Sequence, residues 1–109
     1  MESITNERAE AAIKFLCRTD EQAALAKSYM VGLEKQEKTV LATEMLKSLE
    51  KSAAMKEQEA RCSESYQEWQ KKYENAVYDF EIARNKRNSA SMTVELWRSV
   101  NANRNRGNV

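Results

Sequence analysis

The clearest pattern in the chain is a heptad repeat in its C-terminal half. Eleven positions follow one another at alternating steps of three and four residues, and nine of them are apolar: Tyr66, Trp69, Tyr73, Ala76, Phe80, Ala83, Arg87, Ala90, Val94, Trp97 and Asn101. This spacing places the side chains on one stripe of an α-helix and is typical of a coiled-coil seam. The pattern therefore predicts one long helix over residues 64–102 that packs against another helix.

Weaker apolar stripes in the first half of the chain predict two helices, over about residues 6–17 and 20–49. Asn6 is the expected N-cap of the first helix, because its short polar side chain accepts hydrogen bonds from free backbone amides. Thr19 and Gln22 match a capping box, which indicates that the second helix begins at this point. The sequence thus predicts a short N-terminal helix followed by a longer one.

Between the second and the last predicted helices the periodicity weakens, and several serines are suited to cap helices. A turn is expected near residues 49–53. Ser52 would then cap a short helix over residues 53–61, and Ser63 or Ser65 would begin the last helix. One uninterrupted helix is the alternative, because this region contains no proline or glycine.

Composition favours an all-α fold. The chain has 109 residues, no proline and two glycines, and it is rich in residues that form helices well. We expect an elongated antiparallel helical hairpin or coiled coil with a short N-terminal helix, forming a single domain over residues 1–102. Because so short and extended a chain buries little surface, we also expect a homo-oligomer, with a dimer favoured.

The same composition argues against several function classes. The chain has no histidine and two cysteines at unrelated spacing, so no catalytic residue, metal site, cofactor or small-molecule substrate is expected. No basic, apolar leader and no apolar run of about 20 residues is present, so we expect a cytoplasmic protein without a membrane contact.

Charge is divided unevenly along the chain. Residues 84–109 carry six basic residues and one acidic residue, a net charge of +5, which leaves −4 for residues 1–83. Arginine pairs well with phosphate and asparagine adds hydrogen bonds, whereas a solvated helix face followed by a flexible basic tail at 103–109 needs no ligand. The candidate residues for binding nucleic acid or a partner are Arg84, Lys86, Arg87, Trp97, Arg98, Asn101, Asn103, Arg104 and Arg106.

The segment Val94–Arg104, which reads Val-Glu-Leu-Trp-Arg-Ser-Val-Asn-Ala-Asn-Arg, resembles small helical proteins encoded by tailed bacteriophages. The segments Ala76–Asp79, Arg8–Glu10 and Gly107–Asn108 are similar to the same proteins. The resemblance implies an early or accessory phage protein, often encoded near DNA replication or recombination genes, and located in the bacterial host cytoplasm. It supplies no catalytic residue.

Two functional hypotheses follow. In the first, the chain is a non-enzymatic oligomeric scaffold whose basic C-terminal end contacts DNA or a DNA replication or recombination complex. In the second, it is an interaction or adaptor module whose basic end meets an acidic protein surface, with no nucleic-acid contact. Charge alone does not decide between them.

Overall fold

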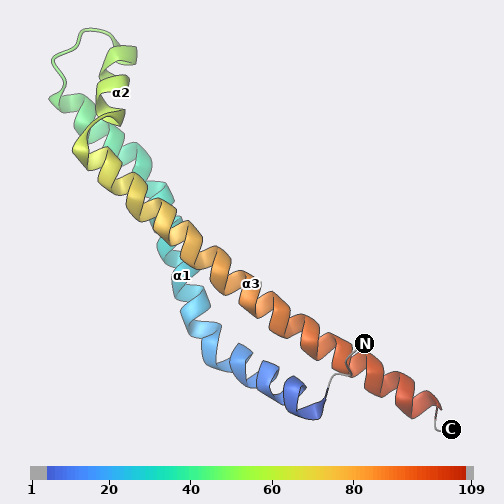
Figure 1. Ribbon diagram of the computed structural model, residues 1–109. Helices are drawn as coiled ribbons and strands as arrows, with labels where there is room; N and C mark the ends of the chain where they lie inside the picture. The colour runs from blue at the N-terminus through green and yellow to red at the C-terminus, as the bar shows by residue number, and fades with distance from the viewer. Residues whose placement is uncertain (1–4, 108–109) are drawn as a thin grey trace. The chain divides into compact units, whose positions relative to one another are not determined.

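A computed structural model describes residues 5–107, and most of these residues are helical. They form three helices, α1 (Asn6–Lys47), α2 (Ala53–Arg61) and α3 (Glu64–Gly107), as Figure 1 shows. No strand occurs between residues 5 and 107, so the all-α prediction is confirmed. Within the same range, no helix is both long and apolar enough to cross a membrane.

The chain groups into two compact units, and the boundary between them falls inside both long helices. Unit 1 consists of Met1–Ala24 and Glu81–Val109, whereas unit 2 consists of Leu25–Phe80. Unit 2 thus contains the end of α1, all of α2 and the beginning of α3. A single helical domain over residues 1–102 stays a prediction.

In unit 2, α1 and α3 run antiparallel. The Trp69 indole Nε1 donates a hydrogen bond to the Leu33 carbonyl oxygen at 2.7 Å, and the Tyr66 hydroxyl donates to Glu37 Oε2 at 3.0 Å. Positions later in α3 therefore meet positions earlier in α1. Together with α2, which lies between the two long helices in sequence, these segments form a helical hairpin, as predicted.

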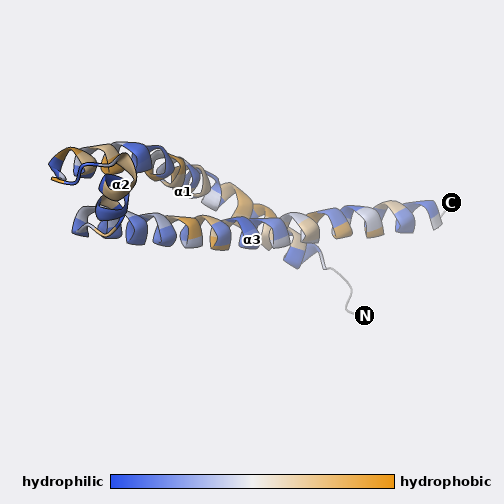
Figure 2. Cartoon of the chain, turned by 90° about the horizontal axis from the view of Figure 1, so that it is seen from above, coloured by the Kyte–Doolittle hydropathy of each residue, from blue (hydrophilic) through white to orange (hydrophobic). Residues whose placement is uncertain are grey.

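Unit 1 shows the same antiparallel order. Arg87 of α3 donates to the Leu16 carbonyl oxygen, and Trp97 donates to the side chain of Asn6. Hydrophilic and hydrophobic residues alternate along both helices (Figure 2). Neither helix therefore has a broad apolar face, and the contact between them is a narrow seam.

The heptad positions of α3 form this seam. All eleven heptad positions from Tyr66 to Asn101 are buried or half-buried. Within α3, every residue of which is described, only Val77, Glu81 and Thr93 are also partly covered. The predicted coiled-coil stripe is therefore confirmed residue by residue.

The predicted break near Thr19 is wrong, because α1 continues without interruption. The Thr19 hydroxyl does not cap a new helix; it donates to the Phe15 carbonyl oxygen, one turn earlier, at 2.7 Å. Leu16, Thr19 and Ala23 keep the heptad spacing through this point and are all partly covered. Packing of this stripe in unit 1 outweighs the local preference of Thr19 for a helix end.

The helix ends differ from the prediction in three places. Thr5, rather than Asn6, caps α1, since the Arg8 amide donates to the Thr5 hydroxyl at 3.1 Å. The same helix ends at Lys47 instead of residue 49. The predicted tail begins too early, because residues 103–107 continue α3, where two arginines in the last turn favourably oppose the negative end of the helix dipole. Residues 108–109 lie outside the described part of the chain.

Serine residues cap the starts of α2 and α3, as predicted. The Met55 amide donates to the Ser52 hydroxyl at 3.1 Å, and the Tyr66 amide donates to the Ser63 hydroxyl at 3.2 Å. Ser63, not Ser65, therefore starts α3. One uninterrupted helix through this region is excluded, because residues 48–52 are not helical.

Gly32 lies inside α1 without a conformational need for glycine. Its φ is not positive, and a Cβ built on it would meet no atom within 4 Å. We expect Gly32→Ala to raise the free energy of unfolding by about 1 kcal/mol, because alanine restricts the unfolded chain and favours the helix. Urea denaturation followed by circular dichroism measures this change. The matched control, Ala42→Gly at an exposed position of the same helix, should shift stability by a similar amount in the opposite direction, and a loss of stability in Gly32→Ala would contradict the expectation.

Candidate nucleic-acid interface

The aromatic residues at the start of α3 are core residues of unit 2. Tyr66 and Trp69 are each 7% exposed and pack with Leu33 and Ala76. The ring centroids of Trp69 and Tyr73 are 5.4 Å apart, and the rings are stacked. Since their faces are used inside the hairpin, these aromatics are not free to stack on bases.

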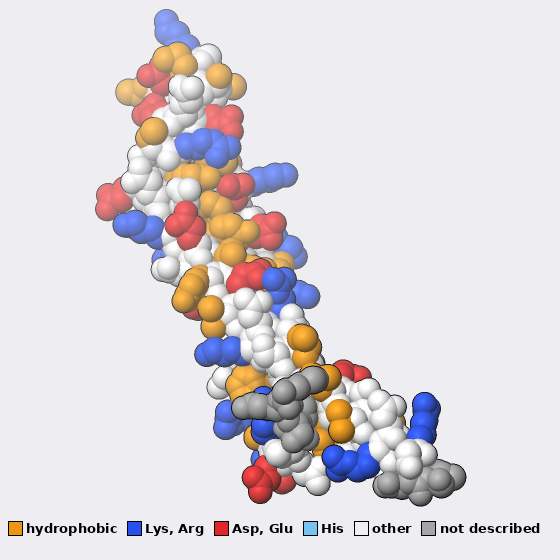
Figure 3. Space-filling view, turned by 45° about the vertical axis from the view of Figure 1, so that its right-hand side comes forward, with side chains coloured by type: hydrophobic (Ala, Val, Ile, Leu, Met, Phe, Trp, Pro, Cys, Tyr) orange, Lys and Arg blue, Asp and Glu red, His pale blue; other side chains and the backbone are white. Residues whose placement is uncertain are grey.

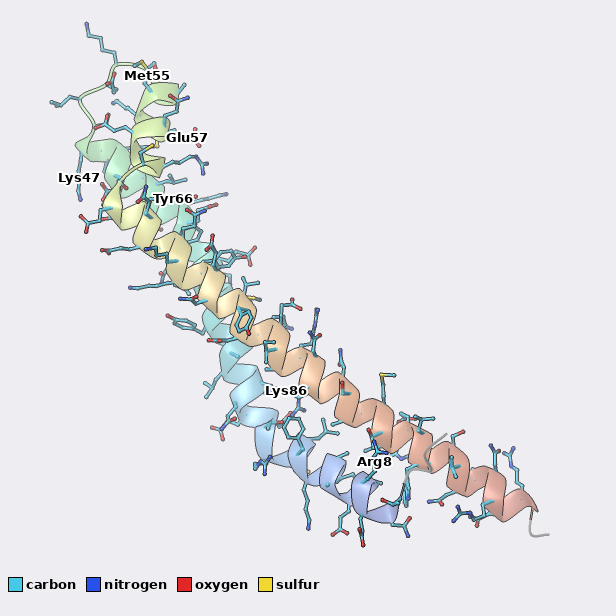
Figure 4. All side chains as sticks on the ribbon, in the orientation of Figure 1. Arg8, Lys47, Met55, Glu57, Tyr66 and Lys86 are labelled. Atoms are coloured by element: carbon cyan, nitrogen blue, oxygen red, sulfur yellow. The ribbon has the colours of Figure 1, made fainter. Side chains whose placement is uncertain are left out.

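A polar network closes the hairpin next to this core. The Tyr66 hydroxyl donates to Glu37 and accepts a hydrogen bond from Arg61 Nη1 at 3.1 Å, and Arg61 Nη2 also donates to Glu57 Oε1 at 2.8 Å. Figure 4 labels Met55 and Glu57 on α2 and Tyr66 at the start of α3. The network thus connects all three helices around one phenol.

Burial raises the pKa of the Tyr66 hydroxyl above its ordinary value of 10.0, and its hydrogen bond to Glu37 adds to the effect. A raised pKa means that the folded state holds this proton more tightly than the unfolded chain, so its contribution to stability is complete below about pH 10 and is lost as the pH rises further. We expect the Tyr66→Phe variant not to lose this contribution to stability as the pH rises above about 10. Melting temperatures between about pH 9 and 11 test it, with Tyr78→Phe, at a 66% exposed tyrosine, as the control that should follow the wild type.

Arg87 is used within unit 1. Its Nη1 donates to the Leu16 carbonyl oxygen at 2.8 Å and to the Thr19 hydroxyl at 2.7 Å, and its Nη2 contacts Asp20 Oδ1 at 3.2 Å. The arginine side chain is 23% exposed. These contacts hold the guanidinium toward α1, so Arg87 does not belong to the candidate interface.

Two further predicted residues also lie on the seam. The Trp97 indole Nε1 donates to Asn6 Oδ1 at 2.6 Å, and both Trp97 and Asn101 are half-buried heptad positions. Trp97 therefore marks the place where the first turn of α1 meets α3.

Arg84 and Lys86 are exposed but lie apart from the arginines at the end of α3. Arg84 pairs with Glu81, one turn earlier on α3. Lys86 is twelve positions before Arg98 in sequence, which is about 18 Å along a helix. The structure does not bring Arg84 and Lys86 together with the arginines at the end of α3.

Beyond Trp97, α3 continues past the first turn of α1, as Figure 1 shows. We call residues 98–107 the C-terminal overhang. It holds three arginines and no acidic residue, and every residue in it except Asn101 is exposed. The remaining predicted residues are found here: Arg98, Asn103, Arg104 and Arg106.

The overhang differs in charge from the rest of the chain. Arg98 pairs with Glu95 at 3.4 Å, but both side chains are about 70% exposed, so water and salt screen this pair strongly. Elsewhere, basic and acidic side chains are interspersed on the face that Figure 3 presents. The overhang is therefore a short, positively charged helical segment that solvent reaches from most sides.

No group of three or more histidine, cysteine, aspartate or glutamate residues that could hold a metal ion occurs between residues 5 and 107. The chemistry available in the overhang is hydrogen bonding and charge pairing by guanidinium and amide groups. Such groups bind anions without changing them covalently.

The sequence matches no family model, and no curated protein or solved structure is significantly similar to it.

Proposed function

We propose that the chain is a non-enzymatic, phage-type accessory protein that binds DNA, or a DNA-bound replication or recombination complex, through the C-terminal overhang. The observation that carries this proposal is an exposed helical segment with three arginines and no acidic residue. Arginine forms charge-assisted, bidentate hydrogen bonds with phosphate oxygens, and release of counterions from DNA drives such binding.

In this proposal, the hairpin of unit 2 and the seam of unit 1 are structural and do not contact DNA. They use Tyr66, Trp69 and Arg87 to hold the helices together. Those residues are thereby occupied, whereas Arg98, Arg104 and Arg106 of the overhang are exposed. Binding would be sensitive to salt and largely independent of base sequence, because phosphate contacts carry no sequence information.

Fluorescence anisotropy with a labelled DNA duplex at low salt tests this function. We expect weak binding by the wild type, at the tight end of the range of roughly 10⁻⁶ to 10⁻⁴ M that non-specific complexes show at physiological salt, because such binding tightens as salt falls. The combined change of Arg98, Arg104 and Arg106 to glutamine should weaken binding by at least about tenfold, because it removes the phosphate contacts.

The matched control removes the same charge elsewhere. Lys35, Lys38 and Lys71 are exposed residues of unit 2, and their combined change to glutamine should alter the affinity by less than about threefold. Equal losses in both triple variants would mean that only net charge matters. Either that result or an absence of binding by the wild type at low salt would refute the proposed function.

A second candidate function is an interaction module without nucleic-acid contact. It is favoured by an exposed apolar row on α3 in unit 1, where Met92, Leu96 and Val100 follow one another at four-residue spacing and are 66%, 45% and 37% exposed. A partner protein or a second copy of the chain would cover this row, since the heptad seam is already occupied by α1. A partner that is retained after nuclease treatment and lost in Met92→Ser/Leu96→Ser would favour this function over the first.

A further inference from the structure

The arginines of the C-terminal overhang project from two opposite sides of α3. In an α-helix each residue turns by about 100°, so Arg98 and Arg106, eight positions apart, lie within about 80° of each other around the axis. Arg104 is six positions after Arg98 and two before Arg106, which places it roughly 120° to 160° from both. Two arginines therefore share one side, and the third points away from them.

A flat ligand surface cannot contact all three arginines at once. An acidic protein patch placed on the side of Arg98 and Arg106 would leave Arg104 in water, and a patch on the other side would contact Arg104 alone. A groove with phosphates on both walls allows all three arginines to bind at once. The major groove of B-form DNA has this geometry, because it is about 12 Å wide and admits one α-helix of about 10 to 12 Å diameter.

We infer that the ligand of the overhang is double-helical DNA, with the end of α3 lying in the major groove, Arg98 and Arg106 on one phosphate wall and Arg104 on the other. This inference rests on the proposed function and specifies its nucleic-acid partner. It does not require base recognition, because each arginine is assigned to the backbone.

The start of α1 limits how far α3 enters the groove. The hydrogen bond between Trp97 and Asn6 holds the first turn of α1 beside α3, and two helices side by side are too wide for a groove that admits one. The overhang, ten residues or about 15 Å of helix in which all but the half-buried Asn101 are exposed, is the part of α3 beyond this contact that can enter.

Single substitutions distinguish a groove from a flat surface. In anisotropy titrations with a 12-base-pair duplex, Arg98→Gln, Arg104→Gln and Arg106→Gln should each weaken binding several-fold and each reduce the slope of log affinity against log salt by about 0.9. On a flat surface, variants from one side alone would lose affinity. Lys86→Gln, an exposed change outside the overhang, is the matched control and should keep the wild-type salt slope.

The form of the nucleic acid provides the second readout. We expect the B-form duplex to bind at least about fivefold more tightly than a single strand of the same length, and more tightly than an RNA duplex, whose deep major groove is too narrow for a helix. Bulky substituents at C5 of the pyrimidines project into the major groove and should abolish this preference.

The possible outcomes separate the two proposals. Equal losses from all three arginine variants, together with a preference for duplex DNA that C5 substituents remove, support the groove. Binding of a single strand or an RNA duplex as tightly as duplex DNA, or losses confined to one side, would overturn the groove while leaving the phosphate-binding function intact. No DNA binding at low salt would overturn both.

Discussion

Replacing Trp69 with alanine is expected to lower the free energy of unfolding by about 3 to 5 kcal/mol, the range usual for removing a buried tryptophan. Trp69 is 7% exposed, stacks on Tyr73 and packs with Leu33 in the core cluster of unit 2. Its indole also donates to the Leu33 carbonyl oxygen. A narrow two-helix seam has few other large side chains with which to fill the resulting cavity.

Urea denaturation followed by circular dichroism at 222 nm, the usual helix band, measures this loss, and the expected value is a large part of the 5 to 15 kcal/mol typical of whole proteins. Tyr78→Ala is the matched control, because Tyr78 is an aromatic residue of α3 that is 66% exposed, and it should change stability by less than about 0.5 kcal/mol. Trp69→Phe should fall between the two, since it keeps most of the packing but loses the hydrogen bond. A loss below about 1 kcal/mol in Trp69→Ala would show that Trp69 contributes little to a packed core.

The heptad repeat of α3 was predictable because its large apolar residues recur at every few positions and no chain breaker interrupts them. The short α2 was predictable for a different reason. Ser52 and Ser63 act locally, each on a backbone amide three residues later, so the signal for the helix ends is contained in a few consecutive residues.

The seam of α1 was harder to recognise because polar residues occupy several of its heptad positions. Thr19, Glu37 and Glu44 keep the spacing and are partly covered, yet they interrupt the apolar stripe. The partners that satisfy Thr19 and Glu37 are Arg87 and Tyr66, 68 and 29 residues away in sequence. A local pattern does not contain such pairings, and this is why one helix was predicted as two.

The candidate site was predicted only in part for the same reason. Composition identified the basic C-terminal end, but it did not separate Arg87 and Trp97, which contact α1, from Arg98, Arg104 and Arg106, which are exposed. Heptad spacing separates Arg87 from Arg98 and Arg106, because an arginine on the seam faces a partner helix, but Arg104 keeps the spacing three residues after Asn101 and is nevertheless exposed. The extent of the overhang depends on which residue of α1 meets Trp97, and this register follows from packing between distant segments.

Replacing Arg87 with alanine is expected to lower the free energy of unfolding by about 2 to 3 kcal/mol. Hydrogen bonds from a charged donor contribute about 1.5 to 3 kcal/mol each when they are protected from water. Arg87 makes two short ones, to Leu16 and Thr19, and because its side chain is 23% exposed, water reduces the contribution of each. Its ion pair with Asp20 adds little, because the Asp20 side chain is 82% exposed.

A control and a conservative variant test whether the loss of these hydrogen bonds causes the lower stability of Arg87→Ala. Arg84→Ala removes an arginine whose side chain is 52% exposed and should cost less than about 1 kcal/mol. Arg87→Met keeps an unbranched stem at the seam and should recover part of the loss, because an apolar side chain at such a position replaces a polar contact at small cost. A double-mutant cycle of Arg87→Ala with Thr19→Val should give a coupling of at least about 0.5 kcal/mol; independent effects would contradict a direct bond between the two side chains. Because Arg87 lies outside the C-terminal overhang, Arg87→Met should also bind DNA as the wild type does, so that stability and DNA binding are lost through different arginines of the same helix.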